Sequence, residues 1–86
     1  MAARQTLSEV GEWIVCTVKM IVDHPDDVRL VEATGQHSVV GELRVNQEDI
    51  GKVIGKRGVH MDAIRRLTYA AAGKRRVRYL LELIED

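Results

Sequence analysis

The sequence of 86 residues lacks the features that define several classes of protein. It has a single cysteine, which excludes an internal disulfide, and Cys16 lies in an apolar helical pattern that favours a buried, inert thiol. No apolar run approaches the roughly 18 residues of a membrane span, and the N-terminus lacks the apolar region of a signal peptide. We therefore expect a cytoplasmic protein that does not enter a membrane.

Aromatic side chains and catalytic arrangements are also scarce. There is no phenylalanine, and Trp13, Tyr69 and Tyr79 fall in segments predicted to serve the core. This argues against nucleic-acid-binding domains that stack bases on aromatic platforms. The histidines lack the spacing of a metal site, and no serine or cysteine has a recognisable base nearby in sequence. The sequence thus predicts no enzyme, no metal site and no cofactor.

Charge is balanced over the whole chain but not along it. Residues 1–50 hold four Lys or Arg against nine Asp or Glu, whereas residues 51–86 hold nine against four. Between Lys52 and Arg78 the only acidic residue is Asp62. This asymmetry predicts a basic face on an acidic body, as expected of a nucleic-acid-binding site, although some of these cations are expected to be merely solvated.

The N-terminal part of the chain is predicted to form a helix. Residues 1–5 are predicted to be a flexible end. From about residue 6, apolar residues recur at spacings of three and four, which predicts a helix. It should end near residues 22–24, because the residue before Pro25 avoids the helical conformation. Its apolar surface is broader than one stripe, so part of it could meet another protein chain.

Three segments have the pattern of β-strands. β-Branched residues at 28–33 and alternating apolar residues at 38–45 are separated by a short turn, which predicts an antiparallel hairpin. A second alternating segment at 76–84 predicts the last strand. With the helices, the order is α-β-β-α-α-β. The sequence therefore predicts an α+β fold in which helices pack on one face of a three-stranded sheet.

Two further helices are predicted between the hairpin and the last strand. Asn46 is a suitable N-cap for a short helix at 47–54, and Asp49 stands at the position of a capping-box partner. A longer helix is predicted at 59–72, with Gly73 as its C-terminal stop.

The turn between these two helices has the sequence Gly55-Lys56-Arg57-Gly58. Glycine lets the backbone turn sharply and lets another backbone approach closely. The turn leads into the second helix, where free N–H groups and the helix dipole favour an anion, and Lys56 and Arg57 add two positive charges. This combination suits a phosphodiester backbone. The glycine spacing taken alone is also compatible with an ordinary turn between helices.

Two other glycine-rich phosphate-binding motifs do not match. A P-loop has a longer spacing before Gly-Lys and then a Ser or Thr, whereas Arg57 occupies that position here. The dinucleotide-binding fingerprint has two glycines separated by one residue after a strand, which this segment lacks.

As a block, residues 50–67 resemble the KH domain, an RNA-binding module. The resemblance rests on Gly55-x-x-Gly58 between two short helices and on the preceding run Ile50-Gly51-x-Val53-Ile54. The order of elements is similar to that of type II KH domains, which are common in prokaryotes, and the resemblance covers residues 6–86 as a single KH domain. A free-standing domain of this length resembles the small bacterial KhpA-type proteins.

The resemblance implies where RNA would bind. In the family, nucleotides lie in a groove between the helix-loop-helix and the adjoining strand, and the loop clamps the backbone of about four nucleotides. Carried onto this sequence, the residues implied are Gly51, Lys52, Ile54, Gly55, Lys56, Arg57, Gly58, Arg65 and Arg44. Val53 and Ile50 either share the apolar floor of the groove or belong to the core. For Arg65 and Arg66 a solvated helix face is the alternative.

The resemblance also implies a function and two kinds of partner. It implies a non-catalytic protein that binds single-stranded RNA, or single-stranded DNA, in post-transcriptional regulation or as an RNA chaperone. A second copy, or a larger KH-containing RNA-binding protein, is the implied protein partner. Two alternatives stay open, a protein–protein interaction module and a ribosome- or assembly-associated factor. Lys56 and Arg57 favour RNA, because a scaffold does not need two cations between these glycines.

Overall fold

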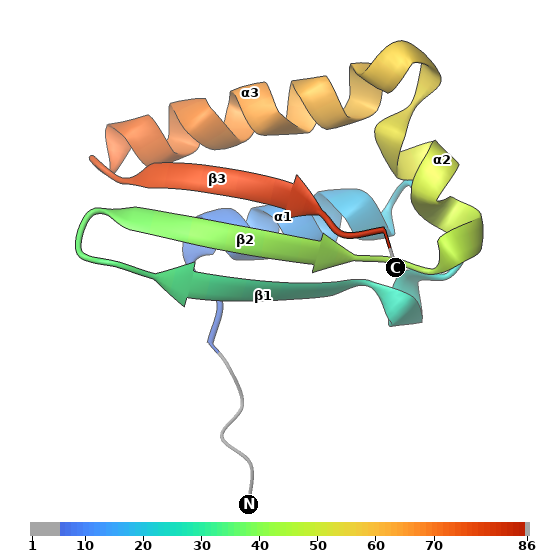
Figure 1. Ribbon diagram of the computed structural model, residues 1–86, viewed down its shortest axis with the longest axis horizontal. Helices are drawn as coiled ribbons and strands as arrows, with labels where there is room; N and C mark the ends of the chain where they lie inside the picture. The colour runs from blue at the N-terminus through green and yellow to red at the C-terminus, as the bar shows by residue number, and fades with distance from the viewer. Residues whose placement is uncertain (1–5, 86) are drawn as a thin grey trace, which may run out of the picture.

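The structure is a computed structural model that describes residues 6–85, and it contains three helices and a three-stranded sheet (Figure 1). In chain order the elements are α1 (Glu9–Lys19), β1 (Arg29–Thr34), β2 (Ser38–Arg44), α2 (Ile50–Ile54), α3 (Val59–Lys74) and β3 (Arg78–Leu83). Short 3-10 turns lie at η1 (Pro25–Asp27), η2 (Gln47–Asp49) and η3 (Lys56–Gly58). The predicted class and the order α-β-β-α-α-β are confirmed. The predicted flexible end at residues 1–5 lies outside the described residues.

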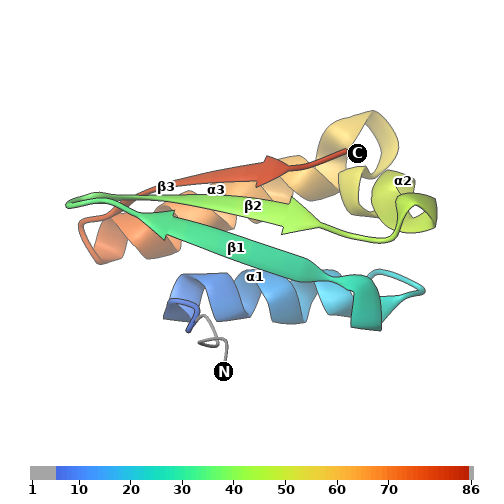
Figure 2. The same cartoon turned by 60° about the horizontal axis from the view of Figure 1, so that its bottom comes forward.

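The central strand of the sheet is β2. It pairs with β1 in the antiparallel sense, as predicted for the hairpin, and with β3 in the parallel sense. A parallel neighbour requires a crossover, and the chain makes it through α2, the glycine turn and α3. Because α3 returns along the sheet, its first turn lies beside the C-terminal end of β3 (Figures 1 and 2).

One face of the sheet carries the helices and the other is open. Leu43 and Leu81 are fully buried beneath the helices, whereas Val31 and Leu80, on the opposite face, each remain 47% exposed. The alternation along the strands therefore sorts side chains as predicted. The buried apolar cluster consists of Val10, Ile14, Val18, Val22, Val28, Leu30, Val39, Leu43, Val53, Met61, Ile64, Ala72, Tyr79 and Leu81.

Helix α1 is shorter than its apolar pattern predicts. The Ser8 side chain accepts a hydrogen bond from the Gly11 N–H at 3.0 Å, and the helix therefore begins only at Glu9. It ends well before Pro25, where the N–H of Met20 turns back to the carbonyl of Thr17. Cys16 lies off the buried stripe and is exposed, so the prediction of a buried thiol is wrong.

Helix α3 continues past the glycine that was predicted to stop it. Gly73 lies inside the helix, and the left-handed residue that ends it is Arg76, with φ of 59°. The N–H groups of Arg76 and Val77 bond to the carbonyls of Gly73 and Ala72, the pattern of a Schellman motif. The prediction failed because an arginine took the left-handed position that glycine usually fills.

A buried carboxylate joins α1 to the sheet. Glu32 accepts hydrogen bonds from the Ser8 N–H at 2.8 Å, from the Ser8 hydroxyl at 2.7 Å and from the Tyr79 hydroxyl at 2.8 Å. Burial, together with the hydrogen bond to Glu32, raises the pKa of Tyr79 above its ordinary value. Tyr79 serves the core as predicted, whereas Trp13 and Tyr69 are 37% and 48% exposed and do not.

Within residues 6–85, no helix combines the length and the apolar character needed to cross a bilayer.

Candidate nucleic-acid interface

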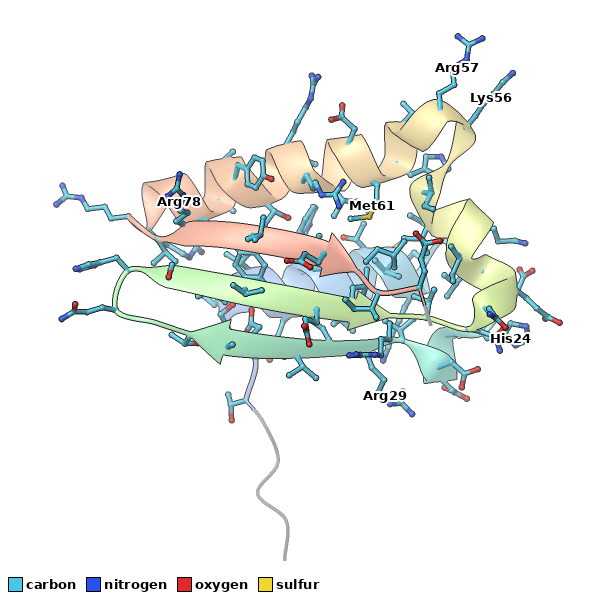
Figure 3. The ribbon with its side chains drawn as sticks, in the orientation of Figure 1. His24, Arg29, Lys56, Arg57, Met61 and Arg78 are labelled. Atoms are coloured by element: carbon cyan, nitrogen blue, oxygen red, sulfur yellow. The ribbon has the colours of Figure 1, made fainter. Side chains whose placement is uncertain are left out.

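Three of the four residues in the turn between α2 and α3 have positive φ. Gly55 has φ and ψ of 77° and 170°, Arg57 has 59° and 24°, and Gly58 has 77° and 15°. Only glycine enters such regions without a steric cost from Cβ. The turn is closed by a hydrogen bond from the Gly58 N–H to the Gly55 carbonyl at 3.0 Å. Lys56 and Arg57 extend from its tip into solvent (Figure 3).

The two glycines of the turn face different surroundings. A Cβ at Gly55 would lie 2.5 Å from Cγ of the His60 ring, whereas a Cβ at Gly58 would meet nothing within 4 Å. The His60 ring is fixed because its Nδ1 bonds to the Lys52 carbonyl at 2.8 Å, which makes Nδ1 the donor. Gly55 is therefore closed off by the protein, and Gly58 is open to a ligand. Sequence spacing did not predict this role for His60.

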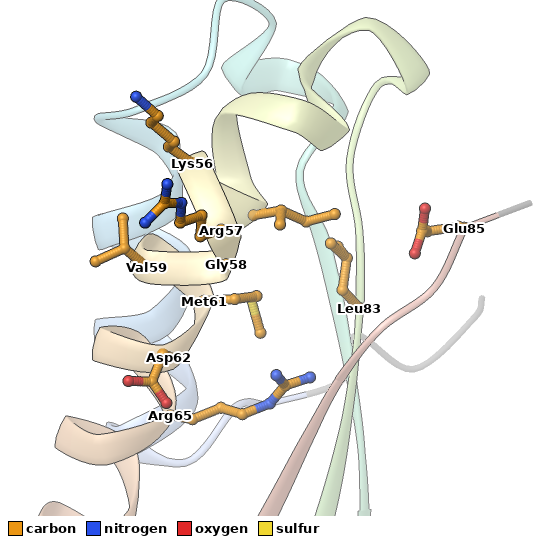
Figure 4. A pocket seen from close by; sticks show the side chains of 10 residues that line it. Lys56, Arg57, Gly58, Val59, Met61, Asp62, Arg65, Leu83 and Glu85 are labelled. Atoms are coloured by element: carbon orange, nitrogen blue, oxygen red, sulfur yellow. The ribbon is translucent and has the colours of Figure 1, made fainter.

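A groove runs beside the turn, between the first part of α3 and the end of β3 (Figure 4). Met61 from α3 and Leu83 from β3 form its apolar floor together with Ile54 from α2. The loop cations stand on one side of this floor and Glu85 on the other (Figure 4). The residues that line the groove are Ile54, Lys56, Arg57, Gly58, Val59, Met61, Asp62, Arg65, Leu83 and Glu85.

The structure brings five of the nine implied residues into this groove: Ile54, Lys56, Arg57, Gly58 and Arg65. Gly55 shapes the turn without lining the groove. Of the two positions that the sequence left open, Val53 is fully buried and belongs to the core, and Ile50 is half-buried.

The other three implied residues lie outside the groove. Lys52 points from α2 toward the segment after α1, where its ammonium lies 3.2 Å from Asp23. Gly51 is exposed on α2 with open space around it. Arg44 alternates with the buried Leu43, and its side chain therefore faces the open side of the sheet. Sequence spacing did not reveal these directions.

Five groove residues were not predicted: Val59 and Asp62, which lie in the first part of α3, and Met61, Leu83 and Glu85. Met61 and Leu83 look like ordinary core positions in the sequence, and Glu85 is an acidic residue after the last strand. Their shared location depends on the parallel pairing of β2 and β3, which brings the end of β3 to the start of α3. No local pattern signals this.

Some charged side chains of the groove are paired within the protein, and others are not. Asp62 forms an ion pair with Arg66 at 3.0 Å, one helical turn away. Arg65 is half-buried, and its Nε donates to the Leu81 carbonyl at 3.2 Å. Lys56 and Arg57 have no ion-pair partner among the residues that the structure describes. Two exposed cations thus remain available to an anion at the mouth of an apolar groove.

A buried aspartate holds α2, and hence the turn, in place. Asp49 accepts hydrogen bonds from the backbone N–H groups of Asp23 at 3.1 Å and His24 at 2.9 Å. Burial alone would raise the pKa of Asp49, but these hydrogen bonds and the nearby His24 and Lys52 charges hold it below its usual value. Asn46 caps the segment as predicted, through Glu48 N–H at 2.8 Å. The capping-box role predicted for Asp49 is replaced by this tertiary anchor.

Comparison with known proteins agrees with this geometry. A family model described as the KH domain of KhpA/KhpB matches residues 12–83. The chain belongs to the KhpA/KhpB KH-domain family. Among its relatives, the "RNA-binding protein KhpA" of Chlamydia pneumoniae is 41% identical over 87% of this chain and 96% of its own length. Proteins of the same name from Caldanaerobacter subterraneus and Halalkalibacterium halodurans are 45% and 49% identical, over 87% and 76% of this chain and 100% and 86% of their own lengths.

Family membership confirms the predicted resemblance and the KH-like fold. The relatives carry the name of an RNA-binding protein rather than that of an enzyme, in agreement with the expected lack of catalysis. Within residues 6–85, no group of three His, Cys, Asp or Glu side chains is placed to hold a metal ion.

Proposed function

We propose that this chain is a non-catalytic protein that binds single-stranded RNA through the groove beside the glycine turn. Lys56 and Arg57 contact the phosphates, and the bases lie against Ile54, Met61 and Leu83. The observation that supports this most is the pair of cations, without an ion-pair partner among residues 6–85, next to an apolar floor. The names of the relatives, all RNA-binding proteins, support it independently.

The composition of the groove favours a single strand over a duplex. An apolar floor can contact a base only when that base is unstacked and turned toward the protein, as in single-stranded segments of RNA. A duplex presents phosphates to the loop but hides its bases. Gly58, which has open space where a Cβ would stand, lets the sugar-phosphate backbone come close to the protein backbone.

The proposal is tested with a fluorescently labelled single-stranded RNA and the corresponding duplex. The single strand is expected to bind, with log affinity falling against log salt at a slope of about −1.4 to −2.1, because two or three phosphates are neutralised. Unlabelled duplex should compete weakly. Equal competition by the duplex would contradict the proposed groove and favour a diffuse basic face. Absence of binding to both would favour the protein–protein interaction module.

The cellular role follows from this chemistry as part of the same proposal. A protein that holds a few nucleotides without cleaving them suits post-transcriptional regulation or RNA chaperoning in the cytoplasm. A ribosome- or assembly-associated factor would use the same groove on ribosomal RNA. Crosslinking of the protein to RNA in cells distinguishes these roles, because a ribosome- or assembly-associated factor would be crosslinked almost exclusively to ribosomal RNA.

A second protein chain is the partner that we propose for the outer side of α3. Leu67 is 58% exposed there, and the small residues Ala63 and Ala70 lie exposed on the same helical face. Such a stripe lets another helix approach closely. One groove that holds a few nucleotides binds modestly, and a second groove on a partner would add avidity. A second copy, or a larger KH-containing protein, meets this need.

The variant Leu67→Glu is expected to shift the protein from dimer to monomer, because it places a charge in the centre of this stripe. Analytical ultracentrifugation at micromolar concentration measures the change. The matched control is Val31→Glu, which places the same charge on the open face of the sheet, where Val31 is 47% exposed. A wild-type protein that is monomeric at high concentration, or a Leu67 variant that stays dimeric, would exclude self-association through α3.

A further inference from the structure

The groove has two chemically different sides. On the side of the turn stand Lys56 and Arg57, and on the side of β3 stands Glu85 (Figure 4). A carboxylate repels phosphate, so an RNA strand that enters the groove is oriented with its backbone at the turn. Its bases then point toward β3. The groups on the β3 side are therefore placed to contact base edges rather than the backbone.

Arg65 is held in a position that suits a base edge. Its side chain reaches from α3 toward β3, on the far side of Met61 from the turn (Figure 4). Its Nε donates to the Leu81 carbonyl at 3.2 Å, which fixes the plane of the half-buried guanidinium. The remaining N–H groups form a planar fork, and a fork that is already fixed loses little entropy on binding. Such a fork donates to two adjacent acceptors, such as O6 and N7 of guanine.

Glu85 supplies the complementary acceptors. Among the described residues it has no ion-pair partner, whereas the other groove carboxylate, Asp62, is neutralised by Arg66 at 3.0 Å. A carboxylate only accepts hydrogen bonds. Next to an RNA strand it is favourable when it accepts from a base that carries N–H groups, such as the amino groups of guanine, cytosine and adenine. Uracil has no amino group, and its one donor on this edge, N3–H, is flanked by two carbonyl oxygens that repel a carboxylate.

We propose that Arg65 and Glu85 make the groove selective for a base with an exocyclic amino group. Guanine fits best, because it offers adjacent acceptors to Arg65 and adjacent N1–H and N2–H donors to Glu85, and uracil fits worst. This inference rests on the proposed RNA binding and adds the class of base to it. It also changes the expected role of Arg65, from a phosphate contact to a base contact.

The test measures the binding of labelled RNAs of about five nucleotides, all uridine except for a central G, C, A or U. Wild type is expected to bind the central-G RNA more tightly than all-uridine RNA by at least about fivefold, the low end for a bidentate base contact. In Glu85→Gln the preference should fall while affinity for all-uridine RNA rises, since a negative charge is lost. In Arg65→Lys, which keeps the charge but loses the fork, the preference should also fall.

Matched controls are Glu82→Gln, on the same strand as Leu83 but exposed, and Arg66→Lys, one residue along α3. Both should keep the wild-type preference. Equal binding of all the RNAs by wild type, with binding still dependent on Lys56 and Arg57, would overturn base selection and leave the proposed function intact. A preference that survives in both groove variants would also overturn it. Absence of any RNA binding would overturn both proposals.

Discussion

Replacing Lys56 and Arg57 together by aspartate is expected to reduce affinity for single-stranded RNA by about a hundredfold or more. Each charge-assisted contact to a phosphate is worth about 1.5–3 kcal/mol, and the introduced carboxylates repel the backbone as well. Both side chains are exposed and have no ion-pair partner among the described residues, so the fold should keep its stability. Fluorescence anisotropy at fixed salt measures the affinity, and circular dichroism checks the fold.

The control for this experiment changes the same number of charges at the other end of α3. Lys74→Asp with Arg76→Asp alters two exposed cations, one in the last turn of α3 and one just beyond it, at the opposite end of the helix from the groove. This variant should lose only the weak, long-range part of the attraction, about threefold or less at physiological salt. Similar losses in the two variants would show that RNA follows net charge rather than the turn. Unchanged binding in the Lys56 and Arg57 variant would place the site elsewhere.

Gly55→Ala is expected to destabilise the protein by about 2 kcal/mol or more and to weaken RNA binding. The backbone of Gly55, with φ and ψ of 77° and 170°, lies in a region reserved for glycine, which alone costs about 1–3 kcal/mol. The new Cβ would also lie 2.5 Å from the His60 ring, which must then give up its hydrogen bond to the Lys52 carbonyl. Urea unfolding gives the stability, and anisotropy gives the affinity.

Two further variants separate the strain from the contact. Gly58→Ala also has positive φ but meets nothing within 4 Å, so it should cost only about 1–2 kcal/mol. Adding His60→Ala to Gly55→Ala should recover part of the lost stability, because the overlap disappears while the backbone strain stays. If the two glycine variants were equally stable, the His60 contact would have no energetic role. No recovery in the double variant would lead to the same conclusion.

The sequence by itself determined the elements of the fold and the chemistry of the turn. Apolar periodicity and turn residues act locally, so the order α-β-β-α-α-β and the antiparallel hairpin could be predicted. The Gly55-Lys56-Arg57-Gly58 turn could also be predicted. It depends on the backbone freedom of its glycines and on the charge of its two cations, which are properties of these residues themselves. The ends of elements were less predictable, because Arg76 adopts a left-handed conformation that sequence rules assign to glycine.

Only the tertiary structure decided which side chains surround the groove. The groove brings together Met61, Leu83 and Glu85 because β3 pairs in parallel with β2 and α3 belongs to the crossover that connects these two strands. No local pattern encodes this long-range arrangement. Lys52 and Arg44 have the right chemistry, but the packing of α2 and the alternation of β2 turn them elsewhere. A sequence specifies which groups are present, whereas the direction in which each one points is set by the surfaces packed behind it.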